Sequence, residues 1–140
     1  GGRIRSTLRR REPHRFGRLI GLGDAVSTAN LLGGEGIRHA LTSSRVLAPL
    51  LLEALQSDRQ DPLRAYPGLL RSALGPRWSL SGRLAKRTWL GLHDSGADQR
   101  LERLLAGLEG ASANTLSALL FDYRFERYGF RALPYLLGWR

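Results

Sequence analysis

The stretch FGRLIGLGDAVSTANLLGGEGIRHALTSSRVL, residues 16–47, decides the fold expected for this chain. Its apolar run over 17–23 is short and bounded by glycines, which is typical of a buried strand in a mostly parallel sheet. A Gly-Asp pair and a glycine-rich loop follow, and the loop leads directly into a long helical pattern. A parallel strand needs neighbours, and the sequence offers no second convincing strand. We therefore expect the sheet to be completed by residues outside this chain.

A long helix is predicted over residues 35 to about 56, where apolar residues recur near helical spacing: Ile37, Leu41, Leu47 or Ala48, Leu51 and Leu55. Pro49 lies inside this helix. Because proline removes one hydrogen bond and clashes with the carbonyl of Arg45, we expect a kink or a break there.

The rest of the chain is expected to be helical with loops. Cap residues and glycine or proline stops predict helices over 62–74, from Ser79 or Ser81 to about 92, from Asp98 to Gly110, and over 113–128 behind a Ser112 cap. The predicted fold class is thus an α/β fragment, with one buried strand and a ligand-contacting loop followed by a mostly helical C-terminal region. Two domains are expected, 1–56 and 57–140.

Composition restricts the kinds of protein this chain can be. Of 140 residues, 42% are hydrophobic and 24% are charged, which are globular values. With no cysteine and three dispersed histidines, we expect neither disulfides nor a metal site. The net charge of +10 comes from 21 Arg and one Lys and favours anionic partners, including phosphates and anionic lipid surfaces. Residues 1–16, rich in arginine, are expected to form a solvated connector, with a phosphate- or nucleic-acid-contacting arm as the alternative.

No signal peptide or membrane span is evident, since the longest apolar runs fall well below the roughly 20 residues that a span requires. A cytoplasmic location is expected, and peripheral contact with a membrane stays open. The chain contains no methionine and opens on Gly1 and Gly2, so we expect it to be a piece of a longer protein.

Two features of the opening stretch can carry chemistry. Asp24 places one carboxylate just past the end of the predicted strand, where ligands bind in open α/β sheets and where a carboxylate accepts hydrogen bonds from sugar or ribityl hydroxyls. Gly-Asp is also a common turn pair. The loop at 33–36 holds three glycines, which permit close backbone approach, and it opens a helix whose first N–H groups attract anions or electron-rich carbonyls. The loop fits neither GxxxxGK[ST] nor GxGxxG.

Together these features resemble the second flavin-contacting segment of FAD-dependent oxidoreductases of the geranylgeranyl reductase and lycopene cyclase type. That family pattern is a strand, GDA, a short loop, and roughly PLTGEGI at the start of a long helix. Residues 23–25 match GDA and residues 34–37 match GEGI, while Leu31 stands in place of the family's frequent Pro and Gly33 in place of Thr. Residues 1–4 resemble the preceding strand end. The likeness covers about 1–48 and is weaker over PRWSLSGRL (76–84) and LLFDYRFERY (119–128), which resemble cyanobacterial members.

The resemblance implies FAD as the cofactor and assigns residues to it. The implied cofactor-binding residues are Gly23, Asp24, Ala25, Gly33, Gly34, Glu35, Gly36 and Ile37. Asp24 would hydrogen-bond the ribityl chain, and the backbone N–H groups of 34–37 would face the pyrimidine edge of the isoalloxazine. The role implied for Glu35 is either a first-turn acid that favours the helix dipole or proton transfer. No catalytic residue is assigned. The family's GxGxxG unit is missing, so the chain alone is expected to bind FAD weakly or not at all.

The resemblance implies an oxidoreductase that acts on an isoprenoid or other apolar substrate, by reduction of a C=C bond or by flavin-assisted cyclisation. The aromatic residues of the tail could line a prenyl tunnel or rest on a membrane, or they could form a plain helical core: Trp78, Trp89, Phe121, Phe125, Tyr128, Tyr135 and Trp139. The competing hypotheses are an Arg-rich helical module that binds nucleic acid or an acidic partner, and an inactive remnant of the flavoenzyme. Nucleic acid is not the expected partner.

Overall fold

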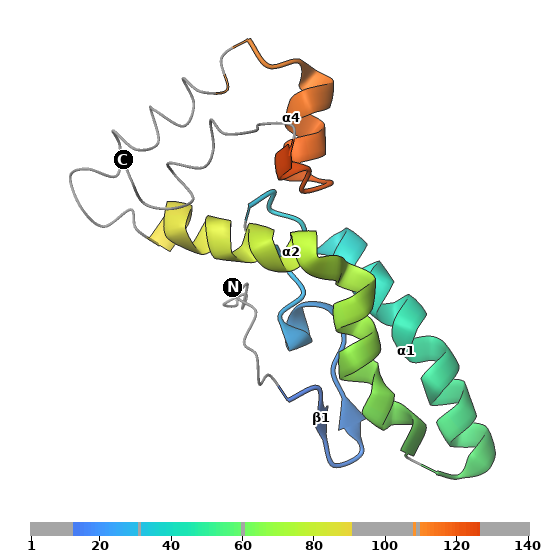
Figure 1. Cartoon of the computed structure of the whole chain (residues 1–140). Coiled ribbons are helices and arrows are strands. Elements are labelled where there is room, and N and C mark those ends of the chain that lie inside the picture. The colour runs from blue at the N-terminus through green and yellow to red at the C-terminus, as the bar shows by residue number, and fades with distance from the viewer. Residues whose placement is uncertain (1–12, 31, 60, 91–107, 109, 127–140) are drawn as a thin grey trace. The chain divides into compact units, whose positions relative to one another are not determined.

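The computed structural model describes residues 13–30, 32–59, 61–90, 108 and 110–126. The chain divides into two compact units, Gly1–Gly82 and Arg83–Arg140, and the boundary falls inside a helix. The elements of the first unit are drawn in blue to green in Figure 1. The predicted domains, 1–56 and 57–140, stay a prediction.

The first unit opens with a small antiparallel hairpin. Strand β1 (Arg15–Phe16) pairs with β2 (Leu19–Ile20), with Phe16 opposite Leu19 and Arg15 opposite Ile20. The turn between them contains Gly17 at a φ of 57°, and a positive φ at the first central position is what a type II′ hairpin turn requires. The structure confirms the predicted class, a mostly helical chain with a small strand element at its N-terminal side.

The strand itself differs from the expectation of a buried parallel strand. It pairs antiparallel with a neighbour from the same chain, and Leu19 is 76% exposed. The cause is the Gly17 turn, which reverses the chain within the apolar run and makes half of that run a hairpin arm. The remaining residues leave the sheet and form the 3-10 turn η1 (Gly23–Val26).

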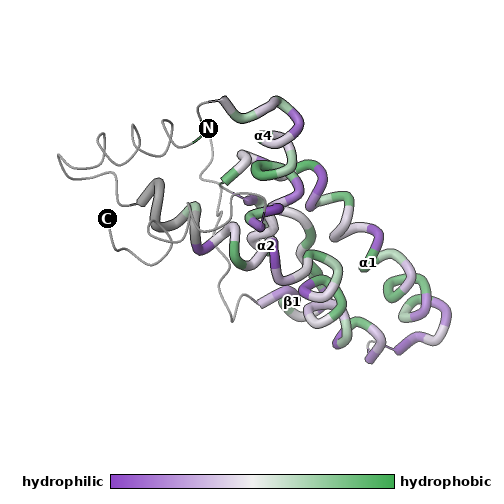
Figure 2. The backbone as a smooth tube through the Cα atoms, turned by 45° about the horizontal axis from the view of Figure 1, so that its top comes forward, coloured by the Kyte–Doolittle hydropathy of each residue, from purple (hydrophilic) through white to green (hydrophobic). Residues whose placement is uncertain are grey.

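Helix α1 (Ile37–Ser57) confirms the long predicted helix. It continues through Pro49 without a break, and Pro49 is exposed, so the hydrogen bond that proline removes lies on the solvent side. Apolar positions recur along the whole helix in Figure 2. The apolar stripe in the sequence is largely solvent-facing, since Ile37, Leu41 and Leu55 are exposed. The buried positions of the helix are His39, Ser43, Leu47 and Ala54.

After α1 the chain turns through η2 (Asp61–Ala65) into α2 (Tyr66–Leu90). Gly75, with φ 77° and ψ 171°, is not helical, and it divides α2 into two helical segments that meet at the bend visible in Figure 1. Pro76 opens the second segment, a position that proline tolerates because its missing N–H would have no partner there. The predicted stop at Gly75-Pro76 is therefore confirmed as a kink. The expected caps at Ser79 and Ser81 are wrong, because both residues lie inside the helix.

The core of the first unit joins η1 to both long helices. Val26, Leu47, Tyr66 and Leu70 form a buried cluster, with Ile20 and further half-buried apolar residues packed against it. Tyr66 is completely buried. The hairpin, the η1 turn and the start of α1 are thus held on one small core, which fixes the geometry of the candidate site.

In the second unit, α4 (Ala113–Leu120) begins at Ser112, whose hydroxyl accepts a hydrogen bond of 3.2 Å from the Thr115 N–H. This confirms the predicted cap. The helix ends at residue 120, well before the expected residue 128, and Tyr123 takes a φ of 55° that helices exclude. The helix predicted between Asp98 and Gly110 falls almost wholly outside the described residues. Within the described part of the chain, no helix is long and apolar enough to cross a membrane.

Candidate functional site

The predicted Gly-Asp-Ala motif forms the first part of the candidate site, in η1. Leu22 enters the turn in an extended conformation, and Gly23 follows with a φ of 58°. The turn closes when the Ser27 N–H donates to the Asp24 carbonyl at 3.1 Å. Asp24 and Ala25 lie on the exposed side of this turn. The carboxylate of Asp24 therefore projects from a backbone that is fixed on both sides.

A hydrogen-bonded triad anchors the turn to both helices. The Gly23 N–H donates to Ser43 Oγ of α1 at 3.0 Å, and Ser43 Oγ shares a hydrogen bond of 2.5 Å with the Tyr66 hydroxyl of α2. All three groups are buried. Burial raises the pKa of the Tyr66 hydroxyl, and the hydrogen bond from Ser43 opposes part of that rise. Tyr66 thus remains a neutral hydrogen-bonding group in this triad.

The glycine-rich loop forms the second part of the site. Asn30 and Glu35 pair across its base: the Asn30 N–H donates to the Glu35 carbonyl at 2.7 Å, and the Glu35 N–H donates to the Asn30 carbonyl at 3.0 Å. The Asn30 side-chain oxygen also accepts from the Leu32 N–H at 2.9 Å. Gly34 takes a φ of 65°, with open space where a side chain would begin. Leu31, one departure from the family pattern, lies outside the described residues.

The loop ends at the first turn of α1. Gly36 is the residue before the helix, and no side chain caps this end. Glu35 Oε2 lies 2.6 Å from the Arg38 guanidinium and 3.5 Å from His39 Nε2, so its carboxylate is engaged with its own helix. Glu35 precedes the N-cap residue Gly36, so it lies just outside the first turn in which it was predicted. Ile37 is exposed at the start of the helix.

The two predicted motifs meet at Asp24 and Gly36. A side chain at Gly36 would place its first carbon 3.3 Å from Asp24 Oδ2 and 3.4 Å from Oδ1, so the carboxylate lies close to this backbone and would have to move slightly if Gly36 were replaced. Asp24 makes no hydrogen bond or ion pair within the described residues. Its carboxylate is thus presented at the uncapped end of α1, where the helix dipole attracts negative charge and electron-rich groups.

Behind this surface lies a buried polar layer. His39 is 4% exposed and meets the Trp78 ring edge-on at 6.0 Å. Burial lowers the pKa of His39, while Glu35 acts in the opposite direction, Arg38 lowers the pKa further and Asp24 raises it. The Trp78 N–H and the Thr28 hydroxyl are buried, and neither has a hydrogen-bond partner in the described part of the chain. Asn30 bonds through its amide to Ser81, which in turn donates to the Trp78 carbonyl at 2.7 Å.

Five of the eight predicted residues have a defined place in this geometry. Asp24 lies close to Gly36, Gly23 is a buried turn residue, Glu35 is paired with Arg38, and Gly34 supplies open backbone. Ala25 and Ile37 are exposed and Gly33 is half-buried, and cofactor binding by all eight residues stays a prediction. Sequence reasoning missed Ser43, Tyr66 and His39. His39 and Ser43 could have been found from their spacing, because residues at i and i+4 lie on the same face of a helix.

Comparison with known proteins gives a partial match. Two curated proteins named menaquinone reductase, from two strains of Mycobacterium tuberculosis (CDC 1551 / Oshkosh and ATCC 25618 / H37Rv), are each 39% identical to this chain over 64 residues. The matched segment is 46% of this chain and spans 14% of the length of the relatives. No family model matches the chain, and no solved structure matches it.

Proposed function

We propose that this chain is the C-terminal portion of an FAD-dependent oxidoreductase that acts on an isoprenoid or other apolar substrate. The observation that carries the proposal is the close approach of the Asp24 carboxylate to Gly36 at the uncapped start of α1. A hydroxyl-bearing chain and an electron-rich ring edge are the two chemical features of a flavin cofactor that such a pair can hold. The menaquinone reductase name of the relatives supports the oxidoreductase assignment.

The residues present fit the flavin end of FAD. Asp24 is exposed and accepts hydrogen bonds, as the ribityl hydroxyls require, and the open backbone at Gly34 allows close approach of a flat ring. When bound, FAD supplies the hydride chemistry. This chain's own contribution is to orient the ribityl chain through Asp24 and to place the end of the α1 dipole beside the ring, which stabilises negative charge by about 0.3–2 kcal/mol.

The relatives and the family resemblance support the proposed substrate class. Menaquinone is a quinone with an isoprenoid side chain, so the name of the relatives agrees with an apolar, isoprenoid substrate. Reduction of a C=C bond is the reaction that we favour, with flavin-assisted cyclisation as the alternative. The exposed apolar positions of α1 fit peripheral contact with a membrane, where such a substrate would reside.

The test is a nuclear magnetic resonance titration of the 140-residue chain with FMN and FAD, followed through backbone amides. We expect chemical-shift changes at residues 23–25 and 33–37. We expect Asp24→Asn to lower the flavin affinity obtained from them by about tenfold, because a charge-assisted hydrogen bond is lost. Asp58→Asn is the matched control: Asp58 is an exposed residue beyond the far end of α1, and asparagine tolerates its φ of 52°.

Two results would contradict the proposal. One is shifts that spread over the arginine-rich surface and respond equally to both Asp variants. The other is tight, stoichiometric binding of FAD, which would contradict the assignment of the chain as one portion of a longer flavoenzyme.

A further inference from the structure

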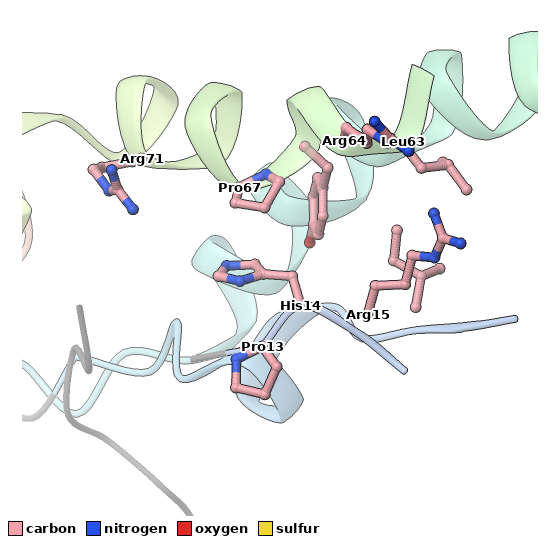
Figure 3. A pocket seen from close by; sticks show the side chains of 9 residues that line it. Pro13, His14, Arg15, Leu63, Arg64, Pro67 and Arg71 are labelled. Carbon is pink, nitrogen blue, oxygen red and sulfur yellow. The ribbon is translucent and has the colours of Figure 1, made fainter. Parts of the chain in front are cut away.

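A recess in the first unit lies apart from the Asp24 site, between the hairpin and the start of α2. Its volume is about 400 Å³, which falls within the usual range for small-molecule sites. Figure 3 shows His14 at the centre of this view, with Arg15 and Arg71 on either side. The candidate flavin site does not use it.

The recess is positively charged. Arg15 comes from β1, Arg64 from η2 and Arg71 from α2, so three cations reach it from three separate elements. No carboxylate belongs to its described lining. One of the three arginines has an acidic partner: Arg64 Nε lies 3.5 Å from Asp61 Oδ1. Asp61 also pairs with Arg59, whose Nη2 lies 3.1 Å from Oδ2. Arg71 has no hydrogen bond or ion pair within the described residues.

The floor of the recess is largely apolar. The Tyr66 ring is buried and meets the His14 ring edge-on at 5.7 Å, and its hydroxyl points away to Ser43. Ile20, Leu63 and Pro67 complete this floor. On the hairpin side, the Arg15 Nε donates to the Gly17 carbonyl at 2.8 Å, which fixes the base of that guanidinium. The charges are thus arranged around a preformed surface.

We propose that this recess binds a phosphate or diphosphate group. Guanidinium groups bind phosphate oxygens through paired, charge-assisted hydrogen bonds, and three arginines that line one recess from separate elements favour a ligand with at least two negative charges. The phosphate belongs either to a small soluble molecule or to a lipid headgroup. The proposal does not rest on the flavin assignment, because none of the three arginines belongs to that site and the two sites share only the structural residue Tyr66.

Calorimetric titration of the 140-residue chain with inorganic diphosphate, at an ionic strength of about 0.15 M, tests the soluble source. We expect saturable binding that weakens by about tenfold in Arg71→Gln and in Arg64→Gln, since each removes charge-assisted hydrogen bonds. Arg45→Gln is the matched control, because Arg45 is an exposed arginine on α1 outside the recess. All three residues are exposed, and thermal melts confirm that each variant folds.

Cosedimentation tests the lipid source. Vesicles of phosphatidylcholine with phosphatidic acid are compared with vesicles of phosphatidylcholine alone, with and without diphosphate as competitor. Binding to the anionic vesicles that requires Arg71 and is displaced by diphosphate identifies a headgroup phosphate; calorimetric binding without vesicle binding identifies a soluble one. The proposal is overturned if Arg45→Gln weakens binding as much as Arg71→Gln, or if neither assay shows binding that depends on Arg71.

Discussion

At the scale of single residues, Gly23 has both a left-handed backbone conformation and a close neighbour, and each of them disfavours a larger residue at this position. Its φ is 58°, and an added Cβ would lie 3.0 Å from the Ala40 Cβ. We predict that Gly23→Ala lowers the free energy of unfolding by about 2–4 kcal/mol, from left-handed strain and overpacking together. Urea denaturation measures the loss. Gly17→Ala is the control, since Gly17 has nearly the same φ but open space around it, and should lose about 1–2 kcal/mol. Equal losses would mean that the contact with Ala40 relaxes freely.

Ser43 holds the Gly23 turn and Tyr66 together. Its removal leaves the buried Gly23 N–H and the Tyr66 hydroxyl without their shared partner, so we predict that Ser43→Ala costs about 1–3 kcal/mol of stability. Ser44→Ala is the neighbouring control: Ser44 Oγ bonds only back to the Ala40 carbonyl of its own helix at 3.0 Å, and its loss should cost less than about 0.5 kcal/mol. In a double-mutant cycle with Tyr66→Phe, the two losses should be less than additive. Strict additivity would show that Ser43 and Tyr66 act independently.

His39 makes the stability of the chain depend on pH. Burial lowers its pKa from the ordinary value of 6.5, so the unfolded chain takes up a proton at a higher pH than the folded chain does. Stability is therefore complete above about pH 6.5 and falls as the pH drops from there toward the folded pKa. The charged groups that face His39 are Glu35, Arg38 and Asp24. Burial, reinforced by Arg38, outweighs the opposing effects of Glu35 and Asp24 on the pKa. We predict that His39→Gln flattens the slope of unfolding free energy between about pH 7 and 5. An unchanged slope in this variant would assign the effect to other groups.

At the scale of elements, the sequence of α1 predicts that a helix forms but does not predict which face of the helix is buried. The helix was predictable from apolar periodicity and from the glycines before it. Its buried face was not, because the more apolar stripe faces solvent and the packed stripe includes His39 and Ser43. The polar pair is buried because Gly23, Tyr66 and Trp78 supply partners from distant parts of the chain, and single-sequence periodicity contains no information about such partners.

Pro49 allows a test of how much a proline inside α1 destabilises the chain. Because the helix continues through this exposed residue, alanine there should restore one backbone hydrogen bond and remove the clash with the Arg45 carbonyl. We predict that Pro49→Ala raises the free energy of unfolding by about 1–2 kcal/mol, less than the full proline penalty because proline also restricts the unfolded chain. Pro76→Ala is the control, since Pro76 opens a helical segment after Gly75 and should gain nothing. Thermal or urea unfolding distinguishes the two variants.

The hairpin shows why the strand prediction was wrong in pairing and burial. An apolar run bounded by glycines has the same composition whether it is a buried parallel strand or one arm of a hairpin. The positive φ of Gly17 selects the hairpin, and glycine identity alone does not reveal the sign of φ. By contrast, the contact between Asp24 and Gly36 was accessible from sequence, since the GDA and GEGI motifs are close along the chain and flank a short loop. The bond between Asn30 and Ser81 was not, because 51 residues separate the partners.

At the scale of the whole molecule, the excess of positive charge is the main property that the description of single helices and strands leaves out. The net charge is +10, and ion pairs of the described residues, such as Arg38 with Glu35 and Arg59 with Asp61, involve partly exposed side chains. Such pairs contribute little to stability, typically below about 1 kcal/mol each. Repulsion among the arginines therefore acts on the folded chain with little local compensation. The same excess of charge is what both the phosphate proposal and the nucleic-acid alternative draw on.

This imbalance predicts that salt stabilises the chain. Raising NaCl from about 0.02 to 0.3 M shortens the Debye length below 10 Å, which weakens repulsion between distant arginines more than attraction within close pairs. We predict a rise in Tm of about 2–8 °C, which corresponds to roughly 1 kcal/mol. Arg45→Glu, which lowers the net charge by two at an exposed site, should be more stable than the parent chain at low salt and should respond less to added salt. If Tm instead falls with salt in the parent chain, attraction within the ion pairs outweighs the repulsion among the arginines. The arginines would then be paired mainly with carboxylates of the same chain, and fewer of them would be free to bind an anionic partner.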